Sequence, residues 1–530
     1  MSTMKPVVLV VLDGWGESLK KKGNPFQEIK LPTIQKLDNF YPKILLEASG
    51  LSVGVPWGEV GNSKVGHQAL GSGQIKYQNL PRINLAIERG SFYQNEALIK
   101  TVQRTIEKKS KLHIMGLLSD GGVHSHINHF LATIELAKEQ KAKEVYLHLI
   151  TDGRDTAPKS SLKFLEILNK KIKKLKIGKI ATIAGRYWTM DRNKNWDRIE
   201  KSYLAMTKGI GIKITDPKKG ILAQHQKGTT DEFLEQMVMT TKNNNPIATI
   251  ENEDSLIFIN FRSDRAKQIT ASFTEDDFNN FSPSIQLKKP YFTSMVEYDP
   301  NLHVNNIAFP TENITETLGK ILSENNKKQL RIAETEKYAH VTYFFNNGRE
   351  IPYPNEDRIV VPSKNVSSYD QLPEMSAKEI TETLIEKINS EKYDFILVNY
   401  ANADMVGHTG NKEAAIKALK CLDECLAEVI PSVLSRNGCL IITADHGNIE
   451  ELINLKTGEK DTEHSTNPVP LWYVTANNHR QKNNSNEVTS QGMLCDVAPT
   501  ILEIMDLPKP PEMTCISLLP ILTSTDNNQY

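Results

Sequence analysis

The stretch VVLVVLDGWG, Val7 to Gly16, is a run of six apolar residues followed at once by an acid, Asp13, and by glycine. A short, continuous apolar run that ends in turn-forming residues is typical of a buried β-strand. Six later stretches have the same form. They are LHIMGLLSDGG (112–122), VYLHLITDGRD (145–155), IATIAGRY (180–187), LIFINFRSDR (256–265), FILVNYANADM (395–405) and LIITADHGN (440–448).

Helical patterns separate these apolar stretches. SLKFLEILNKKIKKL (161–175) and KEAAIKALKCLDECLAEVI (412–430) are two examples. Strands that alternate with helices indicate βαβ units, so we predict an α/β fold built on mainly parallel sheets. Ligands bind outside the carboxyl ends of the strands in such sheets. The polar residues that follow each apolar stretch should therefore share one location.

The composition argues against several classes of function. The chain has 530 residues, of which 39% are hydrophobic and 24% charged, as in an ordinary soluble protein. Lys+Arg and Asp+Glu both number 64, so no overall charge favours nucleic acid or an anionic membrane. No stretch reaches the roughly 20 apolar residues that span a bilayer, and the first one is too short for a signal peptide. Five cysteines without framework spacing predict free thiols in a cytoplasmic protein.

Two segments have the character of joints between domains, residues 74–82 and residues 288–306. A chain of this length has room for two or more domains. If both segments are joints, the part between them is a domain inserted into another. We therefore expect a discontinuous domain of residues 1–77 and 307–530, and an inserted domain of residues 78–306.

Groups suited to a divalent metal gather in the C-terminal half. Asp404 and His408 are four residues apart, which one helical turn would bring to the same face. Asp445 and His446 follow an apolar stretch, and His464 lies in a polar segment. Carboxylate and imidazole suit manganese, zinc and related ions, although any single Asp-His pair is more often a cap or a solvated turn. Asp13 would join these groups if the first and last segments share a sheet.

Ser63, in the stretch VGNSKVGHQALGSG (60–73), allows two interpretations. Alone among glycines, a serine is usually a helix cap or a turn residue. With Asn62 before it and His67 after it, the same hydroxyl has what a metal-activated alkoxide needs: a tight turn, a cation that lowers its pKa and a nearby donor for an oxyanion. The second interpretation makes Ser63 a nucleophile.

Ten stretches together resemble one known family. They are LDGWG, GNSKVGHQALGSG, SDGGVHSHINH, TDGRDTAP, AGRYWTMDR, FINFRSDR, AETEKYAHVTYFFNNG, ADMVGHTGN, TADHGN and EHSTNPVP. They run from Leu12 to Pro470 in the order found in the cofactor-independent phosphoglycerate mutases of bacterial type. The resemblance thus extends over nearly the whole chain.

The resemblance implies a domain of the alkaline phosphatase superfamily interrupted by a transferase-like substrate domain. It implies interconversion of 3-phosphoglycerate and 2-phosphoglycerate through a phosphoserine at Ser63, in glycolysis and gluconeogenesis, with two manganese ions and no bisphosphoglycerate. One ion would take Asp13, Ser63, Asp445 and His446, and the other Asp404, His408 and His464. From the resemblance we also expect a cytoplasmic monomer without nucleic-acid or membrane partners.

The segment expected to form the inserted domain supplies candidate anion-binding residues. Five arginines lie in or near strand-end motifs: Arg154, Arg186, Arg192, Arg262 and Arg265. Arginine pairs with carboxylate and phosphate oxygens through two parallel hydrogen bonds, although a single surface arginine is ordinary. The resemblance adds His124 and Asp155 as substrate contacts, Asp155 as general base or acid, and Lys337 facing the phosphoryl group. His126 and His129 are interpreted as structural or as supports of the substrate contacts.

The sequence departs from the family pattern at Lys64, Ser263 and Ala403, and none of these changes removes a candidate ligand. The nearest alternatives are a metal-dependent phosphatase or sulfatase, or a phosphopentomutase, of the same superfamily. The arginine set favours the mutase over them. A catalytically silent binding protein on this scaffold would lack a ligand or the nucleophile, and neither is missing.

Overall fold

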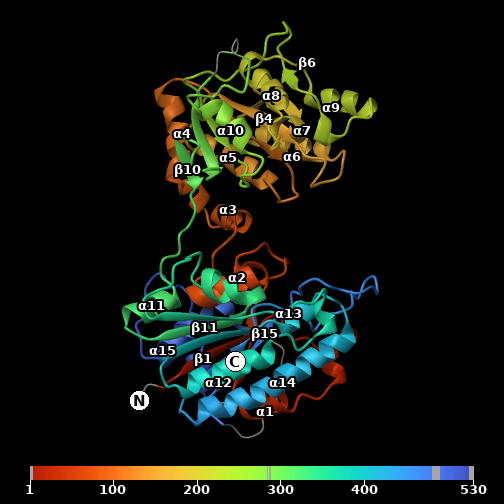
Figure 1. The fold of residues 1–530 in the computed structure, drawn as a ribbon. Helices are drawn as coiled ribbons and strands as arrows, with labels where there is room; N and C mark the ends of the chain where they lie inside the picture. The colour runs from red at the N-terminus through yellow and green to blue at the C-terminus, as the bar shows by residue number, and fades with distance from the viewer. Residues whose placement is uncertain (1–3, 283–284, 286–287, 480–489, 525–530) are drawn as a thin grey trace. The chain divides into compact units, whose positions relative to one another are not determined.

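The computed structural model describes residues 4–282, 285, 288–479 and 490–524, and the chain forms two compact units (Figure 1). Unit 1 comprises Met1–Gln78 and Asn313–Tyr530, and unit 2 comprises Asn79–Glu312. Each unit has its own hydrophobic core and, among the described residues, its own eight-stranded sheet. The predicted fold class, α/β with mainly parallel sheets, is confirmed, and all seven apolar stretches quoted above contain strands.

The sheet of unit 1 combines strands from both ends of the sequence. Across the sheet the order is β12 (Glu356–Val361), β11 (Gln329–Glu334), β13 (Phe395–Tyr400), β1 (Val7–Leu12), β14 (Cys439–Thr443), β15 (Val469–Val474), β2 (Lys43–Glu47) and β16 (Ser490–Met493). The first five strands are parallel, and β15 is antiparallel to both of its neighbours. Val7 is in register with both Phe395 and Cys439, so β1 lies between β13 and β14, two strands from the C-terminal half of the chain.

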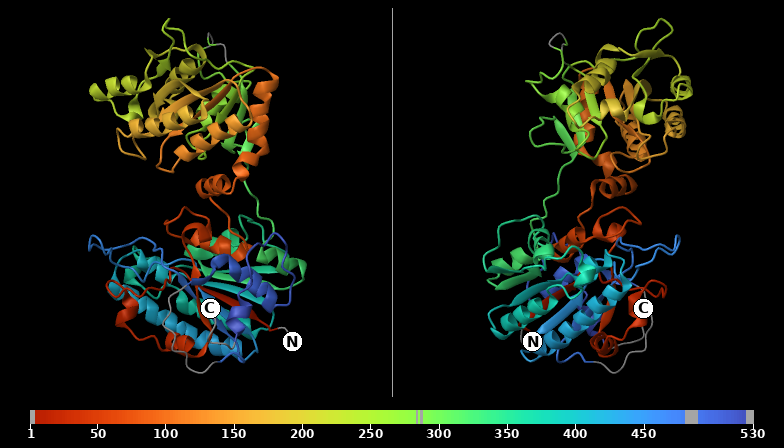
Figure 2. Two further views of the ribbon diagram at one scale, coloured as in Figure 1. Left: turned by 180° about the vertical axis from the view of Figure 1, so that it is seen from behind. Right: turned by 45° about the vertical axis from the view of Figure 1, so that its right-hand side comes forward.

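Helices cover both faces of this sheet (Figures 1 and 2). One group consists of α1 (Pro32–Phe40), α12 (Ala377–Asn389), α13 (Asn402–Gly407) and α14 (Lys412–Leu434), and the other of α2 (Ser63–Ser72), α11 (Leu318–Glu324) and α15 (Val497–Ile504). A last helix, α16 (Leu519–Thr523), packs on α15. The short helical turns are η1 (Pro25–Glu28), η2 (Gly50–Val53), η5 (Thr335–Lys337), η6 (His340–Phe344), η7 (Tyr369–Gln371) and η8 (Leu494–Asp496).

Unit 2 repeats the plan with its own elements. The order across its sheet is β10 (Asn306–Phe309), β9 (Tyr291–Val296), β8 (Ser255–Phe258), β3 (Leu112–Leu118), β4 (Val145–Thr151), β5 (Lys179–Gly185), β7 (Met237–Met239) and β6 (Ile212–Ile214). The first six are parallel, and β7 is antiparallel to β5. The helical elements are α3 (Asn79–Glu88), η3 (Ser91–Gln94), α4 (Glu96–Glu107), α5 (Ile127–Glu139), α6 (Ser161–Leu175), α7 (Arg186–Thr189), α8 (Trp196–Lys208), α9 (Pro217–Gln226), η4 (Asp231–Phe233) and α10 (Lys267–Thr274).

The return to unit 1 lies later in the chain than the sequence analysis expected. Much of segment 288–306 is sheet, because β9 pairs with β8 and β10 pairs with β9. The chain re-enters unit 1 between Glu312 and Asn313. Polar flanks, LKKP before β9 and YDPN after it, concealed a six-residue strand of which five residues are buried.

The prediction that all cysteines are free is wrong for one pair. Cys495 in η8 and Cys515 are joined by a disulfide, and the backbone N–H of Cys515 also donates to the carbonyl of Gly73 at the end of α2. Cys421, Cys425 and Cys439 are free and buried. The 20-residue separation of the pair carries no signal by itself, since only the packing of α15 and η8 against α2 brings the two thiols together.

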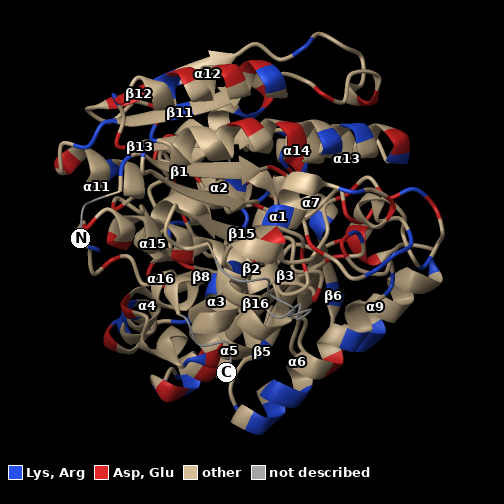
Figure 3. Ribbon diagram, turned by 90° about the horizontal axis from the view of Figure 1, so that it is seen from below, with Lys and Arg blue, Asp and Glu red and all other residues tan. Residues whose placement is uncertain are grey.

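Charges of both signs are distributed over the chain, in keeping with its formal net charge of zero (Figure 3). Lysines are most concentrated along α6. Three lysines of α6 have acidic partners, since Lys163 pairs with Asp120, Lys170 with Glu166 and Lys171 with Glu135. Within the described ranges, no helix has both the length and the apolar character needed to cross a membrane.

His129 makes the stability of unit 2 dependent on pH. Its side chain is buried on α5, with Nε2 3.0 Å from the Asn84 side-chain oxygen, and burial lowers its pKa to about 3. An unfolded chain binds a proton at this position below about pH 6.5, whereas the folded protein binds none until about pH 3. The stabilisation is therefore present above pH 6.5 and is lost as the pH falls from there.

We expect His129 to account for about 2 kcal/mol of lost stability between pH 7 and pH 5. Urea unfolding at both pH values measures this loss. In His129→Gln the difference between the two pH values should shrink by that amount, whereas the exposed His303→Gln should leave it unchanged. Equal pH dependence in all three proteins would contradict the expectation.

Candidate active site

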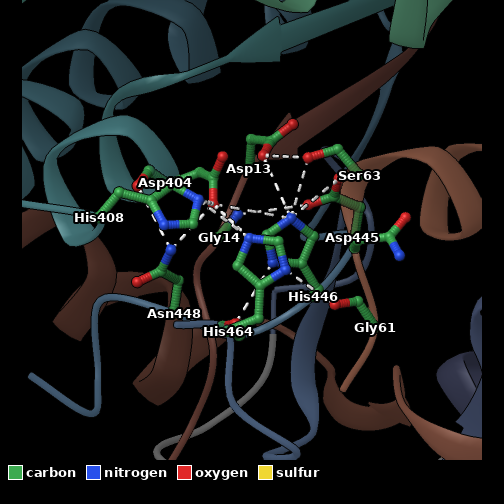
Figure 4. A network of polar contacts seen from close by, with 12 residues as sticks. Asp13, Gly14, Gly61, Ser63, Asp404, His408, Asp445, His446, Asn448 and His464 are labelled. Atoms are coloured by element: carbon green, nitrogen blue, oxygen red, sulfur yellow. Dashed lines mark hydrogen bonds and ion pairs between the residues drawn. The ribbon is translucent and has the colours of Figure 1, made fainter. Parts of the chain in front are cut away.

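Four adjacent parallel strands bring the central groups of unit 1 to one edge of the sheet (Figure 4). Asp13 follows β1, Asp445 follows β14, and Asp404 lies in α13, directly after β13. Lys337 follows β11 in the turn η5. All four side chains are nearly inaccessible to solvent. The structure thus places these residues at the shared location that the strand-end pattern predicted.

Ser63 is the first residue of α2, whose N-cap is Asn62. The Asn62 side-chain oxygen accepts a hydrogen bond from the backbone N–H of Val65 at 3.1 Å, which fixes the start of the helix. The Ser63 hydroxyl is buried and lies 3.1 Å from Asp13 Oδ1 and 3.0 Å from His446 Nε2. The cap is therefore Asn62, and the Ser63 hydroxyl points into the cluster.

Lys337 is the cation of this cluster. Its ammonium donates to Asp13 Oδ1 at 2.7 Å, to the Ser63 hydroxyl oxygen at 2.8 Å and to Asp404 Oδ2 at 2.5 Å. Burial opposes the charge on this side chain, but the carboxylates of Asp13 and Asp404 outweigh it and raise the Lys337 pKa. The lysine is therefore charged, and its three contacts span both candidate ligand sets.

Asp404, His408 and His464 form a second cluster beside the first. Asp404 Oδ1 lies 3.2 Å from His408 Nε2 and 3.1 Å from His464 Nε2, and the two imidazole nitrogens are 3.1 Å apart. Each ring has its Nδ1 on a backbone carbonyl, His408 on Thr462 at 2.7 Å and His464 on Gly61 at 2.8 Å. A carbonyl only accepts, so Nδ1 carries the proton and Nε2 presents its lone pair to the cluster.

His446 lies between the two clusters. Its Nε2 is 3.5 Å from Asp13 Oδ1 and 3.8 Å from Asp404 Oδ1, and its ring stacks on that of His464 with centroids 3.9 Å apart. Burial favours a neutral ring, but Asp445 and the other carboxylates prevail and raise the pKa of His446 to about 10. Burial likewise opposes ionisation of Asp13 and Asp404, yet Lys337 and the histidines lower the pKa of both carboxyl groups.

Unit 2 has a cluster of opposite sign at the carboxyl ends of β8, β3, β4 and β5, the central strands of its sheet. Burial and then the like charges of Arg186, Arg192 and Arg154 lower the pKa of Arg265. Burial and then Arg186 lower the pKa of His124 to about 4, so this imidazole is neutral at pH 7. We call Arg154, Arg186, Arg192, Arg262 and Arg265 the arginine cluster, and the charges of Arg186 and Arg262 both help to keep His124 neutral.

Carboxylates hold the arginine cluster in place. Buried Arg186 donates to Asp152 Oδ1 at 2.6 Å and to Asp155 Oδ2. Asp264 accepts from Arg192 at 3.0 Å, also pairs with Arg262 at 3.0 Å, and faces His124 Nδ1 at 3.7 Å. The other two arginines of the cluster have different partners. Arg154 is half-exposed and lies 3.5 Å from Glu232, and Arg265 donates to the Met190 carbonyl at 3.1 Å.

Comparisons with known proteins match two family models to overlapping parts of the chain. A family model described as BPG-independent PGAM N-terminus matches residues 83–300, and one described as type I phosphodiesterase / nucleotide pyrophosphatase matches residues 262–491. A 2,3-bisphosphoglycerate-independent phosphoglycerate mutase of Clostridium novyi (strain NT) is 48% identical over 514 residues, which cover 97% of this chain and 99% of the relative. The chain belongs to this mutase family.

Further members of the mutase family show similar agreement. The 2,3-bisphosphoglycerate-independent phosphoglycerate mutase of Clostridioides difficile (strain 630) is 45% identical over 515 residues, again 97% of this chain and 99% of the relative. The crystal structure of Leishmania mexicana phosphoglycerate mutase at low cobalt concentration matches with 30% identity and a TM-score of 0.51, covering 97% of each chain. The resemblance in the ten sequence motifs is therefore confirmed at the level of the family.

The mutase motifs of unit 1 fit a divalent metal in their donor atoms. Ligand atoms of Asp13, Asp445 and His446 all lie within 4.8 Å of one another, and so do those of Asp404, His446 and His464. The lone pairs of Asp404 Oδ1, His408 Nε2 and His464 Nε2 converge on one another. A cation bound between these three atoms would stabilise this arrangement. The residues present thus suit one ion in each cluster.

Several buried polar residues support these clusters, and apart from His67 the sequence analysis did not single them out. Asn399 donates to Asp13 Oδ2 at 2.8 Å, His67 lies 3.0 Å from Asp445 Oδ2, and Asn448 donates to Asp404 Oδ1 at 3.0 Å. In unit 2 the corresponding residues are Asp152 and Asp264. Asn399 had a signal, because it is a polar residue inside the apolar stretch FILVNY. Asn448, Asp152 and Asp264 lie inside quoted motifs in which neighbouring residues were chosen as the candidates.

The remaining sequence expectations have simple structural outcomes. Lys64 is exposed, and its ammonium lies 5.8 Å from the centre of the Phe344 ring. His126 is the N-cap of α5, where its ring accepts a hydrogen bond from the backbone N–H of Asn128. His129 is the buried residue described above. Both histidines therefore have structural contacts, as expected.

Gly66 lets α2 approach the strand-end residues. A Cβ on Gly66 would lie 2.8 Å from the Asp445 Cβ and closer still to the Asp445 carbonyl oxygen. We expect Gly66→Ala to lower the free energy of unfolding by about 1–3 kcal/mol, because neither helix nor strand end can move without repacking the core.

Urea unfolding measures this cost. Lys64→Ala, on the exposed face of the same helix, is the matched control and should change stability by less than about 0.5 kcal/mol. A Gly66→Ala protein as stable as the wild type would show that α2 can shift freely, contrary to this account.

Proposed function

We propose that this protein interconverts 3-phosphoglycerate and 2-phosphoglycerate through a phosphoserine on Ser63. The observation that carries the proposal is the position of the Ser63 hydroxyl. It is buried at the start of α2, within 3.1 Å of Asp13, His446 and Lys337. The names of the relatives that share nearly the full length of this chain support the same reaction.

The first half-reaction uses the residues of unit 1. Ser63 Oγ attacks the phosphorus of 3-phosphoglycerate, the bond from phosphorus to the C3 oxygen breaks, and the phosphoryl group passes to the serine. Charge that develops on the phosphoryl oxygens is compensated by the Lys337 ammonium, and the positive end of α2 faces the same group. Two divalent metal ions, which we propose are manganese, would lower the pKa of the serine hydroxyl and polarise the phosphoryl group.

The second half-reaction returns the phosphoryl group to the C2 oxygen of the same glycerate. We assign retention of glycerate to the arginine cluster of unit 2, because guanidinium groups bind carboxylate and phosphate oxygens in pairs. Asp155, which Arg186 contacts, would exchange a proton with the reacting hydroxyl. His124 is neutral at pH 7 and would act as an uncharged contact of the substrate.

Bisphosphoglycerate has no part in this scheme, because the phosphoryl group that reaches C2 comes from the phosphoserine. The proposal includes a monomeric, cytoplasmic enzyme without nucleic-acid or membrane partners. It also keeps the division of labour expected from the sequence, in which the discontinuous part of the chain handles the phosphoryl group and the inserted part handles glycerate.

A phosphorus NMR time course tests the reaction. The wild type, given 3-phosphoglycerate and Mn²⁺ without bisphosphoglycerate, should produce 2-phosphoglycerate and no free phosphate. Ser63→Ala should lose at least about 10⁴-fold in rate, since it lacks the nucleophile. Release of inorganic phosphate by the wild type would instead identify a phosphatase, and full mutase activity of Ser63→Ala would overturn the phosphoserine.

Removal of metal tests the second element of the proposal. Dialysis against a chelator should abolish turnover, and Mn²⁺ or Co²⁺ should restore it, because the donor sets mix imidazole and carboxylate. Ca²⁺ prefers six to eight oxygen ligands and should restore much less. Undiminished activity in the chelated protein, with metal content verified by elemental analysis, would contradict the proposal.

A further inference from the structure

Glu450 is a buried carboxylate in the segment that follows β14, with 1% of its surface exposed. It accepts four hydrogen bonds. Its Oε2 accepts from the backbone N–H groups of Gly16 at 3.0 Å and Asn448 at 2.9 Å. Its Oε1 accepts from the Asn467 side-chain amide at 2.9 Å and from the Ser465 hydroxyl. Both oxygens are therefore fully used as acceptors.

The four donors belong to three separate segments, and each segment carries a candidate metal ligand. Gly16 comes from the turn after β1, Asn448 from the turn after β14, and Ser465 and Asn467 from the segment before β15. The ligands in these segments are Asp13, then Asp445 and His446, and then His464. One side chain thus connects parts of the chain more than 430 residues apart.

Asn448 extends the connection to the fourth segment. Its backbone N–H is held by Glu450, and its side-chain amide donates to Asp404 Oδ1 at 3.0 Å and to the Asp404 carbonyl at 3.4 Å. Asp404 Oδ1 is the atom that both His408 and His464 approach. Glu450 is therefore connected to every segment that supplies a carboxylate or histidine ligand, directly or through Asn448, without contacting a ligand itself.

Two glycines show how closely the chain packs around this carboxylate. A Cβ at Gly16 or at Gly447 would overlap the Glu450 carboxyl group. Both glycines belong to motifs quoted above, LDGWG and TADHGN. The absence of side chains at these two positions is what allows the segments to converge on Glu450.

The hydrogen-bond partners of Glu450 carry no charge that could neutralise its carboxylate. Among residues 4–282, 285, 288–479 and 490–524, no lysine or arginine forms an ion pair with it, and its four donors are all uncharged. Burial of a carboxylate without a cation costs free energy that the four hydrogen bonds must offset. A carboxylate has two oxygens with about four acceptor sites, and all four are needed here.

We propose that Glu450 is a positioning residue that sets the spacing of the ligands in both metal clusters. The inference rests on the proposed metal-dependent function, which it deepens. Groups that hold metal ligands in place commonly change metal affinity about 10- to 100-fold when they are removed. Because Glu450 joins both clusters, its loss should weaken both ions.

Co²⁺ titration of the metal-free protein, followed by calorimetry and by the visible absorption spectrum, tests this directly. Glu450→Ala should weaken Co²⁺ binding about 100-fold and change the spectrum. Glu450→Gln keeps an oxygen for the two backbone donors, while the Ser465 hydroxyl and the Asn467 amide can reorient toward the new NH₂ group. It should therefore be partly rescued, with a loss of about 10-fold.

Asp423 provides a matched control. It is a buried carboxylate of the same unit that accepts the backbone N–H groups of Thr33 and Ile34 at the start of α1, away from the metal clusters. Asp423→Asn and Asp423→Ala should lower stability in urea and leave Co²⁺ affinity and spectrum unchanged. Ser465→Ala, which removes one donor of Glu450, should weaken mainly the ion bound near His464 and serves if Glu450→Ala does not fold.

Two outcomes would overturn the inference. One is Co²⁺ affinity within about twofold of the wild type in both Glu450→Gln and Ser465→Ala, where a positioning role requires about 10-fold. The other is an equal loss of affinity in the Asp423 variants. Mutase activity of the wild type is measured separately. If the wild type binds Co²⁺ and the Glu450 variants lose affinity but the wild type has no mutase activity, the proposed function fails and the inference stands. If the wild type is an active mutase and the Glu450 variants bind Co²⁺ as tightly as the wild type, only the inference fails.

Discussion

The accumulation of buried negative charge at one edge of a sheet is the constraint on which unit 1 depends. Asp13, Asp404 and Asp445 come from three neighbouring strands and are all nearly inaccessible to solvent. Carboxylates in that position are tolerable only with compensating charge and donors, which Lys337 and His446 supply. The same electrostatic environment makes Ser63 reactive in the mechanism proposed here, so stability and chemistry rest on one set of contacts.

Unit 2 also gathers charged side chains at the carboxyl ends of parallel strands, but here the charges are positive. Arginines gather at the carboxyl ends of its central strands, and the carboxylates of Asp152, Asp155 and Asp264 keep them apart and oriented. With Glu232 beside Arg154, four carboxylates face the five arginines, so one positive charge of the cluster has no carboxylate partner among these residues. The two units thus differ in chemistry because different residues follow similar strands, and the sheets themselves are ordinary.

Much of this organisation could be predicted from the sequence, because it depends on the order of apolar and polar residues within short segments. The seven strands and the helices α6 and α14 follow from continuous apolar runs and helical periodicity, and the location of their polar tails follows from parallel topology. Strand β9 was missed because its Lys, Pro and Asp flanks resemble a joint. The pairing of Cys495 with Cys515 depends on how α15 packs, which no spacing reveals. Glu450 was missed for a related reason, since its four donors come from segments that only the fold brings together.

The central place of β1 has a consequence for how the protein is made. This strand is synthesised long before both of its neighbours, β13 and β14, which lie near residues 395 and 439. At about 5–20 residues per second, the apolar segment VVLVVL waits on the order of tens of seconds for the strands that cover it. Unit 2 is continuous in sequence and can fold during that interval. The newly synthesised N-terminal segment is therefore a natural client for chaperones that shield unpaired apolar strands.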